Sequence, residues 1–147
     1  MIPRYGEPIR RSVRYRERQG AYAIILEGDR ILLTRQALPQ PEFQLPGGGI
    51  DPGESPLAAL HREAAEETGW TISIDRRLGA YRWFVYIPEH DMWARKTCRI
   101  YLARPVRQTG LPGEDGHTAI WTNPELAARL LVSDGERQML RRHVLVH

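Results

Sequence analysis

Three glutamates stand close together at positions 63, 66 and 67. On an α-helix, residues at this spacing share one face, with Cβ atoms only about 5–6 Å apart. Like charges at that separation repel by about 3 kcal/mol per pair at an effective dielectric of about 20, so this cluster opposes local stability. Oxygen ligands of this kind suit a hard cation, Mg²⁺ or Mn²⁺. The alternative is an acidic helix face that is simply solvated.

Capping residues indicate a helix over residues 56–68 that carries these glutamates. Ser55 suits the N-cap, Pro56 the first helical position, and Gly69 the position just past the end. One arc of this helix is apolar and is expected to pack on the domain; it consists of Leu57, Leu60 and Ala64. The glutamates occupy the adjacent arc, so one face packs and the other is acidic.

The glutamates belong to a longer motif of fixed spacing. Its positions are Gly48, Glu54, Arg62, Glu63, Glu66, Glu67 and Gly69. The pattern G-x5-E-x7-R-E-h-x-E-E-x-G-h, where h is hydrophobic, resembles the Nudix box at every fixed position. That box is the signature of metal-dependent hydrolases that cut nucleoside diphosphates linked to another group. The resemblance therefore implies an enzyme that acts on a phosphoric anhydride bond.

The resemblance also implies roles for individual residues. Glu63 and Glu67 are the expected direct ligands of Mg²⁺ or Mn²⁺, and Glu66 binds a metal or orients the attacking water. Arg62 pairs with a carboxylate and so holds the cluster in place. A backbone carbonyl at Gly48 or its preceding neighbour is an expected further ligand, because glycine lets the main chain approach an ion without a Cβ in the way.

Aromatic residues are the candidates for substrate recognition, since Nudix enzymes share the box and differ in the surrounding loops. Aromatic faces stack on nucleobases for about 1–3 kcal/mol per base. We expect Trp83 and Trp93, beside the turn at 87–93, and also Tyr22 to contact the substrate. For each of them, the alternative is an ordinary aromatic residue in the core.

The loop before the predicted strand at 119–121 adds polar candidates. Glu114 and Asp115 lie between glycines, in the region where some Nudix enzymes place an extra metal ligand or general base. We therefore include Glu114 among the expected catalytic residues. His117 is a further acid–base candidate because imidazole titrates near neutral pH. The alternative is that these residues are solvated parts of a turn.

Strand patterns surround the acidic helix on both sides. Apolar, β-branched and aromatic runs predict strands at 21–26, 31–34, 43–46, 71–74, 78–87, 97–106 and 119–121. Segments 36–55 and 107–117 are predicted to be mostly loop, and further helices are expected after Asn123 and from Ser133 to Val146. This order indicates an α/β (α+β) fold. The resemblance implies a Nudix-like α/β/α sandwich with a central mixed sheet.

Composition favours one globular domain over residues 1–147, with 41% hydrophobic and 27% charged residues. The sequence has no apolar run of about 18 residues and no basic-then-apolar leader, so we expect a cytoplasmic protein without a membrane partner. The single cysteine, Cys98, excludes an internal disulfide framework and is expected to be a buried structural thiol. The oligomeric state stays open, and a homodimer is among the possibilities.

Residues 1–19 are predicted to form a basic N-terminal arm. The first 20 residues hold six arginines against Glu7 and Glu17, which gives 6 − 2 = +4, while the whole chain is +3. Such an arm could attract nucleotide phosphates, RNA or an acidic partner. Because no recognised RNA-binding motif accompanies the charge, we favour an arm or strand whose arginines face water.

We therefore predict a pyrophosphohydrolase dependent on Mg²⁺ or Mn²⁺ that acts on a small nucleotide, with house-cleaning or regulatory nucleotide pyrophosphatases as the leading class. One alternative is removal of pyrophosphate from RNA 5′ ends, for which the arginine arm is the hint. A second is a nucleotide-sensing module without turnover on the same fold. The intact set of Glu63, Glu66 and Glu67 argues against the second alternative.

Overall fold

The structure is a computed structural model that describes residues 2–37, 40–111 and 116–145. The strands are β1 (Arg4–Gly6), β2 (Arg16–Glu27), β3 (Arg30–Gln36), β4 (Glu42–Gln44), β5 (Gly47–Gly49), β6 (Trp70–Ile87), β7 (Met92–Gln108) and β8 (His117–Thr122). The helical elements are α1 (Pro56–Thr68), the 3₁₀ turn η1 (Pro88–His90), α2 (Pro124–Leu130), α3 (Asp134–Leu140) and the π-helical turn η2 (Arg141–Leu145).

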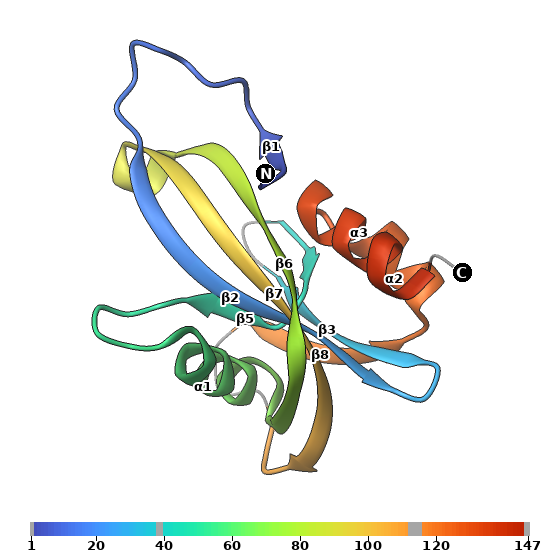
Figure 1. Ribbon diagram of the computed structural model, residues 1–147. Helices are drawn as coiled ribbons and strands as arrows, with labels where there is room; N and C mark the ends of the chain where they lie inside the picture. Colours follow the sequence, from blue (N-terminus) through green and yellow to red (C-terminus); the bar gives the residue numbers. More distant parts are fainter. Residues whose placement is uncertain (1, 38–39, 112–115, 146–147) are drawn as a thin grey trace.

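The strands form one mixed sheet. Their order is β1-β6-β7-β2-β3-β4, with β5 paired to β2 and β8 paired to β3. The pairs β1–β6 and β2–β7 are parallel, and the other pairs are antiparallel. Helix α1 covers one face of this sheet, while α2 and α3 cover the other (Figure 1). The predicted α/β/α sandwich around a mixed sheet is confirmed.

The core lies in two layers, one on each side of the sheet. Ile24 and Ile25 are neighbours in β2 and point to opposite faces, because side chains alternate along a strand. Ile25 packs in a buried cluster with Leu60 of α1, whereas Ile24 packs in a second cluster with Leu140 of α3. The same cluster on the α3 side contains Cys98, which is 3% exposed, as expected for a structural thiol, and burial raises its pKa to about 11.

Helix α1 begins and ends as its caps predict. The Ser55 hydroxyl accepts a 3.1 Å hydrogen bond from the Ala58 N–H, and Gly69 adopts the left-handed conformation at φ 77°. The helix buries Leu60 and its neighbours against β2 and β6. The prediction for Leu57 was wrong, since this side chain is 45% exposed in the first turn, beyond the edge of the packed face.

Several strand boundaries differ from the sequence prediction. Residues 71–74 and 78–87 belong to one strand, β6. The sequence between them breaks the strand pattern, but bulges near Arg76 and Gly79 shift the register there while pairing with β7 continues. The segment 47–49 forms strand β5 instead of a loop. Glycine is required there, since a Cβ on Gly47 would stand 2.2 Å from the Ala21 carbonyl oxygen.

The C-terminal part of the chain also departs from prediction. The helix expected from Ser133 to Val146 ends at Leu140 and continues as the π-helical turn η2, which brings Val144 and Leu145 against the core. His117, predicted in a loop, is the first residue of β8. Within the described residues, none of the helices has the length and apolar composition needed to cross a membrane.

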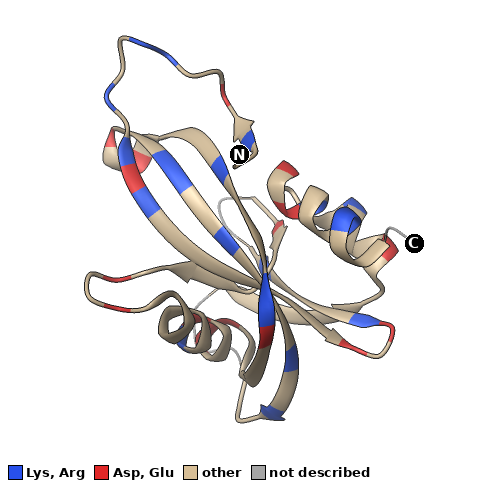
Figure 2. Cartoon of the chain, in the orientation of Figure 1, with Lys and Arg blue, Asp and Glu red and all other residues tan. Residues whose placement is uncertain are grey.

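The basic N-terminal segment contributes two pieces to the sheet. Arg4–Gly6 forms β1 on β6, and Arg16 opens β2, so the arm leaves the sheet only between these strands. Figure 2 shows Lys and Arg along this segment and along the adjoining ends of β2 and β7.

Candidate functional site

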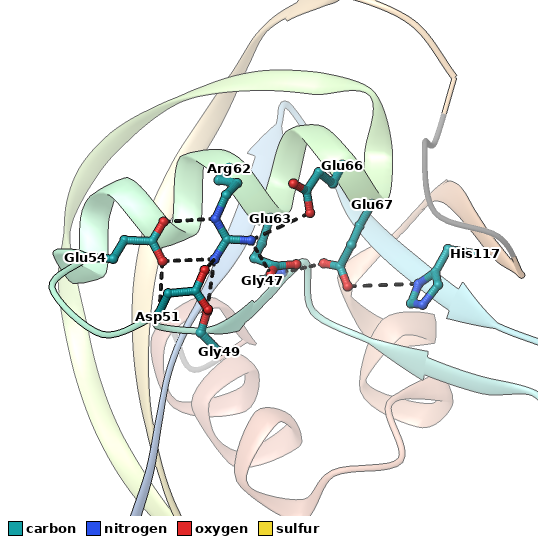
Figure 3. Close-up of polar contacts among 9 residues, drawn as sticks. All are labelled: Gly47, Gly49, Asp51, Glu54, Arg62, Glu63, Glu66, Glu67 and His117. Carbon is teal, nitrogen blue, oxygen red and sulfur yellow. Dashed lines mark hydrogen bonds and ion pairs between the residues drawn. The ribbon is translucent and has the colours of Figure 1, made fainter.

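Glu67 is the most buried carboxylate of the acidic helix face. It is 6% exposed, and its Oε1 accepts a 2.7 Å hydrogen bond from the Gly47 backbone N–H. Its Oε2 lies 3.9 Å from Nδ1 of His117 (Figure 3). The last turn of α1 is thereby fixed to β5 and lies near the start of β8. The structure brings together His117 and the helix glutamates, which the sequence placed far apart.

Glu63 packs directly on the glycine strand. A Cβ on Gly48 would lie 2.7 Å from Cδ of Glu63 and 2.9 Å from its Oε2, so any other residue at this position would displace the carboxylate. The Glu63 side chain is 15% exposed, whereas that of Glu66, one turn further along the helix, is 45% exposed. The three glutamates therefore range from buried to open, and Glu66 is the one that solvent reaches most readily.

Arg62 holds the carboxylates together. Its Nε and Nη2 each donate a 2.9 Å hydrogen bond to Glu54, and its Nη1 donates a 2.7 Å bond to Glu63. The guanidinium also lies 3.7 Å from Glu66 and 3.5 Å from Asp51 (Figure 3). Hydrogen bonds from Arg62, together with the Asp51 backbone N–H, lower the pKa of Glu54 to about 2. Glu54 thus stays ionised and anchors the arginine beside Glu63 and Glu66.

This donor set fits a hard divalent cation. Carboxylate oxygens of Glu63 and Glu67 lie against the glycine strand β5, and Glu66 stands beside Glu63 at the Arg62 guanidinium. Oxygen ligands are those that Mg²⁺ and Mn²⁺ prefer. Among the described side chains, no group of three or more acidic, imidazole or thiol side chains is arranged so that it could hold a metal ion by itself. A diphosphate would have to supply part of the coordination shell.

A cleft opens beside the box loop. Its volume is about 580 Å³, and its wall contains residues 49–52 of the loop, Tyr22 and Lys96. A smaller cavity of about 80 Å³ continues toward α3 and shares Tyr22 and Lys96 with it. Trp83 lines this smaller cavity, and Nζ of Lys96 lies 5.1 Å from the centre of its ring. Such a volume is in the range of small-molecule sites.

The predicted aromatic candidates separate into two places. Tyr22 and Trp83 share the small cavity, and burial raises the pKa of Tyr22 well above its ordinary value. Trp93 lies apart from them, in an edge-to-face cluster with Tyr15 and a tilted contact with Tyr86. Glu114 lies outside the described residues, so its role stays a prediction.

The structure adds residues that the sequence did not single out. Lys96 lines the cleft. In the sequence, it could have been singled out by its position one residue before the predicted strand at 97–106. Glu136 is fully buried beside the small cavity, and its carboxylate accepts a 3.2 Å hydrogen bond from the Leu45 N–H. The sequence signal for Glu136 is its place three residues after Ser133, which caps α3.

Comparison with known proteins places this geometry in a family. The family model of the NUDIX domain matches residues 16–143, which is most of the chain. The chain belongs to the NUDIX family. The matched range contains the whole acidic helix, the glycine strand and the cleft described above. Nudix hydrolases generally use divalent metal ions, which agrees with the oxygen donors of α1.

Individual NUDIX relatives resemble parts of the chain. An RNA pyrophosphohydrolase of Helicobacter pylori strain G27 is 52% identical over 44 residues, which is 30% of this chain and 28% of that protein. An 8-oxo-(d)GTP phosphatase of Mycolicibacterium smegmatis is 28% identical over 103 residues, which is 70% of this chain and 30% of that protein. These alignments span less than a third of either relative.

The fold itself matches solved NUDIX structures. A NUDIX hydrolase from Nitrosomonas europaea superposes with a TM-score of 0.70 at 20% identity, covering 86% of this chain and 87% of that one. A MutT protein from Methanosarcina mazei Go1 gives a TM-score of 0.67 at 21% identity, covering 88% and 94%. At this identity the likeness establishes the fold.

Proposed function

We propose that the chain is a pyrophosphohydrolase that cleaves the anhydride of a nucleoside diphosphate linked to another group, with Mg²⁺ or Mn²⁺ as cofactor. One observation carries this proposal: the carboxylates of Glu63 and Glu67 lie against the glycine strand β5, whose last residue, Gly49, lines a cleft large enough for a nucleotide. A solvated acidic face would not need an arginine to hold its carboxylates or a glycine to make room for one.

Each residue of the box has a task in this proposal. Glu63 and Glu67 would hold the metal, together with Glu66 and the Gly48 carbonyl. When bound, such an ion polarises the phosphoryl oxygens and makes a coordinated water more acidic. Glu66 is the carboxylate most open to solvent, so it is suited to orient the attacking water and accept its proton. Arg62 keeps the carboxylates in register and reduces their mutual repulsion.

The cleft provides for the rest of the substrate. The Lys96 ammonium lies at its wall and offers a positive charge to a phosphate, while Tyr22 and Trp83 offer aromatic surface to a base. The leading substrate class is a small nucleotide of the house-cleaning type, in keeping with the name of the Mycolicibacterium relative. The second candidate is an RNA 5′ end, which the name of the Helicobacter relative and the exposed arginines of the N-terminal segment favour.

A hydrolysis screen tests the proposal. The panel contains nucleoside triphosphates, oxidised nucleotides, nucleotide sugars, ADP-ribose, diadenosine polyphosphates and a 5′-triphosphorylated RNA, each with Mg²⁺ and with Mn²⁺. We expect metal-dependent cleavage of a phosphoric anhydride in at least one compound. A wild-type protein that binds nucleotides but cleaves none of them would indicate the non-catalytic module instead. To test the role of the carboxylate, the activity of Glu66→Gln is compared with that of the matched control Glu125→Gln, which lies at the exposed start of α2.

A further inference from the structure

Segment 45–47 connects two short strands that pair with different neighbours. Strand β4 pairs with β3, whereas strand β5 pairs with β2. The chain therefore crosses from one strand of the β2–β3 hairpin to the other at Leu45 and Pro46. The Pro46 carbonyl oxygen accepts a 2.9 Å hydrogen bond from the Ala23 N–H, which fixes the crossing to β2.

Two buried carboxylates from different helices hold the backbone N–H groups of this segment. Glu136 accepts a 3.2 Å hydrogen bond from the Leu45 N–H, and Glu67 accepts a 2.7 Å hydrogen bond from the Gly47 N–H. Glu136 belongs to α3 and Glu67 to α1, and these helices cover opposite faces of the sheet (Figure 1). The two side chains are 3% and 6% exposed. The segment is thus held from both faces of the sheet.

The backbone between these two N–H groups has little freedom. Pro46 has no N–H of its own, its ring fixes its φ angle, and it also restricts the conformation of the preceding Leu45. The side chain of Leu45 is 1% exposed and packs in the core cluster on the α3 side. A displacement of Leu45 is therefore passed on to Gly47.

Strand β5 depends on how its first residue is anchored. All three of its residues are glycines, which have the greatest conformational freedom and no side chain to pack. The box carboxylates lie directly against this strand, since the Gly47 N–H binds Glu67 and a Cβ on Gly48 would lie 2.7 Å from Cδ of Glu63. The position of β5 therefore determines where the carboxylates of Glu63 and Glu67 stand.

The start of α3 holds Glu136 in place on its side of the sheet. The Val132 N–H donates a 3.3 Å hydrogen bond to the Phe43 carbonyl oxygen, so the residues before α3 are fixed to β4. The Ser133 hydroxyl caps the helix by accepting a 3.2 Å hydrogen bond from the Glu136 N–H. Glu136 lies in the first turn of α3, so its carboxylate has a defined position relative to Leu45.

We propose that Glu136 is a positioning residue for the metal-binding carboxylates. Its carboxylate holds the Leu45 N–H, the rigid Pro46 transmits this position to Gly47, and the Gly47 N–H orients Glu67. This inference rests on the metal role that the proposed function gives to Glu63 and Glu67. Glu136 itself touches neither metal nor substrate. Loss of its acceptor oxygen would weaken metal binding although every carboxylate of the box is still present.

Three variants separate this role from a contribution to packing alone. Glu136→Gln keeps an oxygen that accepts from the Leu45 N–H, whereas Glu136→Met has a similar length and no such oxygen. The control Met139→Ala removes a buried side chain that faces Gly79 of β6 from the same helix, and it leaves the acceptor intact.

Hydrogen exchange of single amides, followed by NMR without metal, tests the path from Glu136 to β5. Rates are compared with that of the Ile100 amide in the centre of the sheet. In Glu136→Met, we expect the Leu45 and the Gly47 amides both to exchange about tenfold faster or more, and in Glu136→Gln to stay near the wild type. Faster exchange at Leu45 with an unchanged Gly47 amide would overturn the inference, because the hydrogen bond would then be only local.

Titration with Mn²⁺ alone, followed by electron paramagnetic resonance without nucleotide, gives the functional readout. Loss of an outer-shell partner of a metal site typically costs about 10–100-fold in affinity, so we expect half-saturation to rise about tenfold in Glu136→Met. Glu136→Gln and Met139→Ala should stay within about twofold of the wild type. Wild-type affinity in Glu136→Met, or an equal loss in Met139→Ala, would overturn the inference and leave the proposed function standing.

The reference variant Glu63→Gln/Glu67→Gln distinguishes this failure from a failure of the proposed function. We expect it to lose the Mn²⁺ site that the wild type and Glu136→Gln retain. A wild type that binds Mn²⁺ no better than this double variant would contradict the metal role of the box, and the positioning role of Glu136 would fall with it.

Discussion

The buried carboxyl group of Glu136 makes the free energy of unfolding depend on pH, and this dependence can be measured. Glu136 lies in α3 and is 3% exposed, and the Leu45 N–H donates to its carboxylate at 3.2 Å. In the described chain, no Lys, Arg or His nitrogen lies within 4.0 Å of its carboxylate. Burial therefore raises the pKa of Glu136 from 4.5 to about 8.

The sign of the effect follows from the raised pKa. The folded protein holds the proton of Glu136 at pH values where the unfolded chain has lost it, so this group stabilises the fold fully below pH 4.5. That stabilisation falls by about 1.4 kcal/mol per pH unit and is gone above about pH 8. Over the whole interval the loss is on the order of 5 kcal/mol.

Glu136→Gln isolates this contribution, because glutamine can still accept from the Leu45 N–H and does not ionise. Urea unfolding of both proteins in EDTA, at half-unit steps from pH 5 to 8.5, gives the difference in free energy of unfolding. We expect near-equal stability at pH 5 and a variant that is more stable by several kcal/mol, about 4 to 5, at pH 8.5. The exposed Glu125→Gln serves as the control and should give a flat difference. A flat difference for Glu136→Gln as well would refute the reasoning.

Two further predictions concern the box. Gly48→Ala places a Cβ 2.7 Å from Cδ of Glu63 and should lower kcat about tenfold or more in steady-state assays, whereas Gly110→Ala, with no heavy atom within 4 Å of the new Cβ, should leave kcat unchanged; equal kcat values would remove Glu63 from the site. Because the pKa of Glu54 is lowered to about 2, Glu54→Gln should cost stability near pH 7, and this cost should vanish as the pH falls from 4.5 to about 2. A cost that does not change with pH in acid unfolding curves would contradict the Arg62 pairing.

The acidic helix was the part of the molecule that the sequence predicted best. Its caps are local features, so Ser55, Pro56 and Gly69 sufficed to set both ends of α1. The hairpin of β2 and β3 followed for the same reason, from two apolar runs around a Gly-Asp turn. The order of elements indicated the α/β (α+β) class, but the sandwich around a mixed sheet needed the family resemblance, because local pattern does not give the order of strands in a sheet.

Features that depend on distant contacts were missed. The strand at Gly47–Gly49 has no strand propensity and exists because β2 lies close enough to exclude a side chain. The position of Trp93, away from Tyr22 and Trp83, depends on the register between β6 and β7. The contact between His117 and Glu67 joins residues 50 positions apart, which no periodicity in the sequence can indicate.

Turnover with and without metal tests the central claim most directly. The panel is assayed with wild type, with Glu63→Gln/Glu67→Gln and with the control Glu125→Gln, each in Mg²⁺, Mn²⁺ or EDTA, and products are identified by mass. We predict that the wild type and the control cleave a phosphoric anhydride, and that EDTA or the double substitution lowers the rate at least about a hundredfold. Absence of anhydride cleavage by the wild type across the panel, or equal rates for the double variant, would contradict the account.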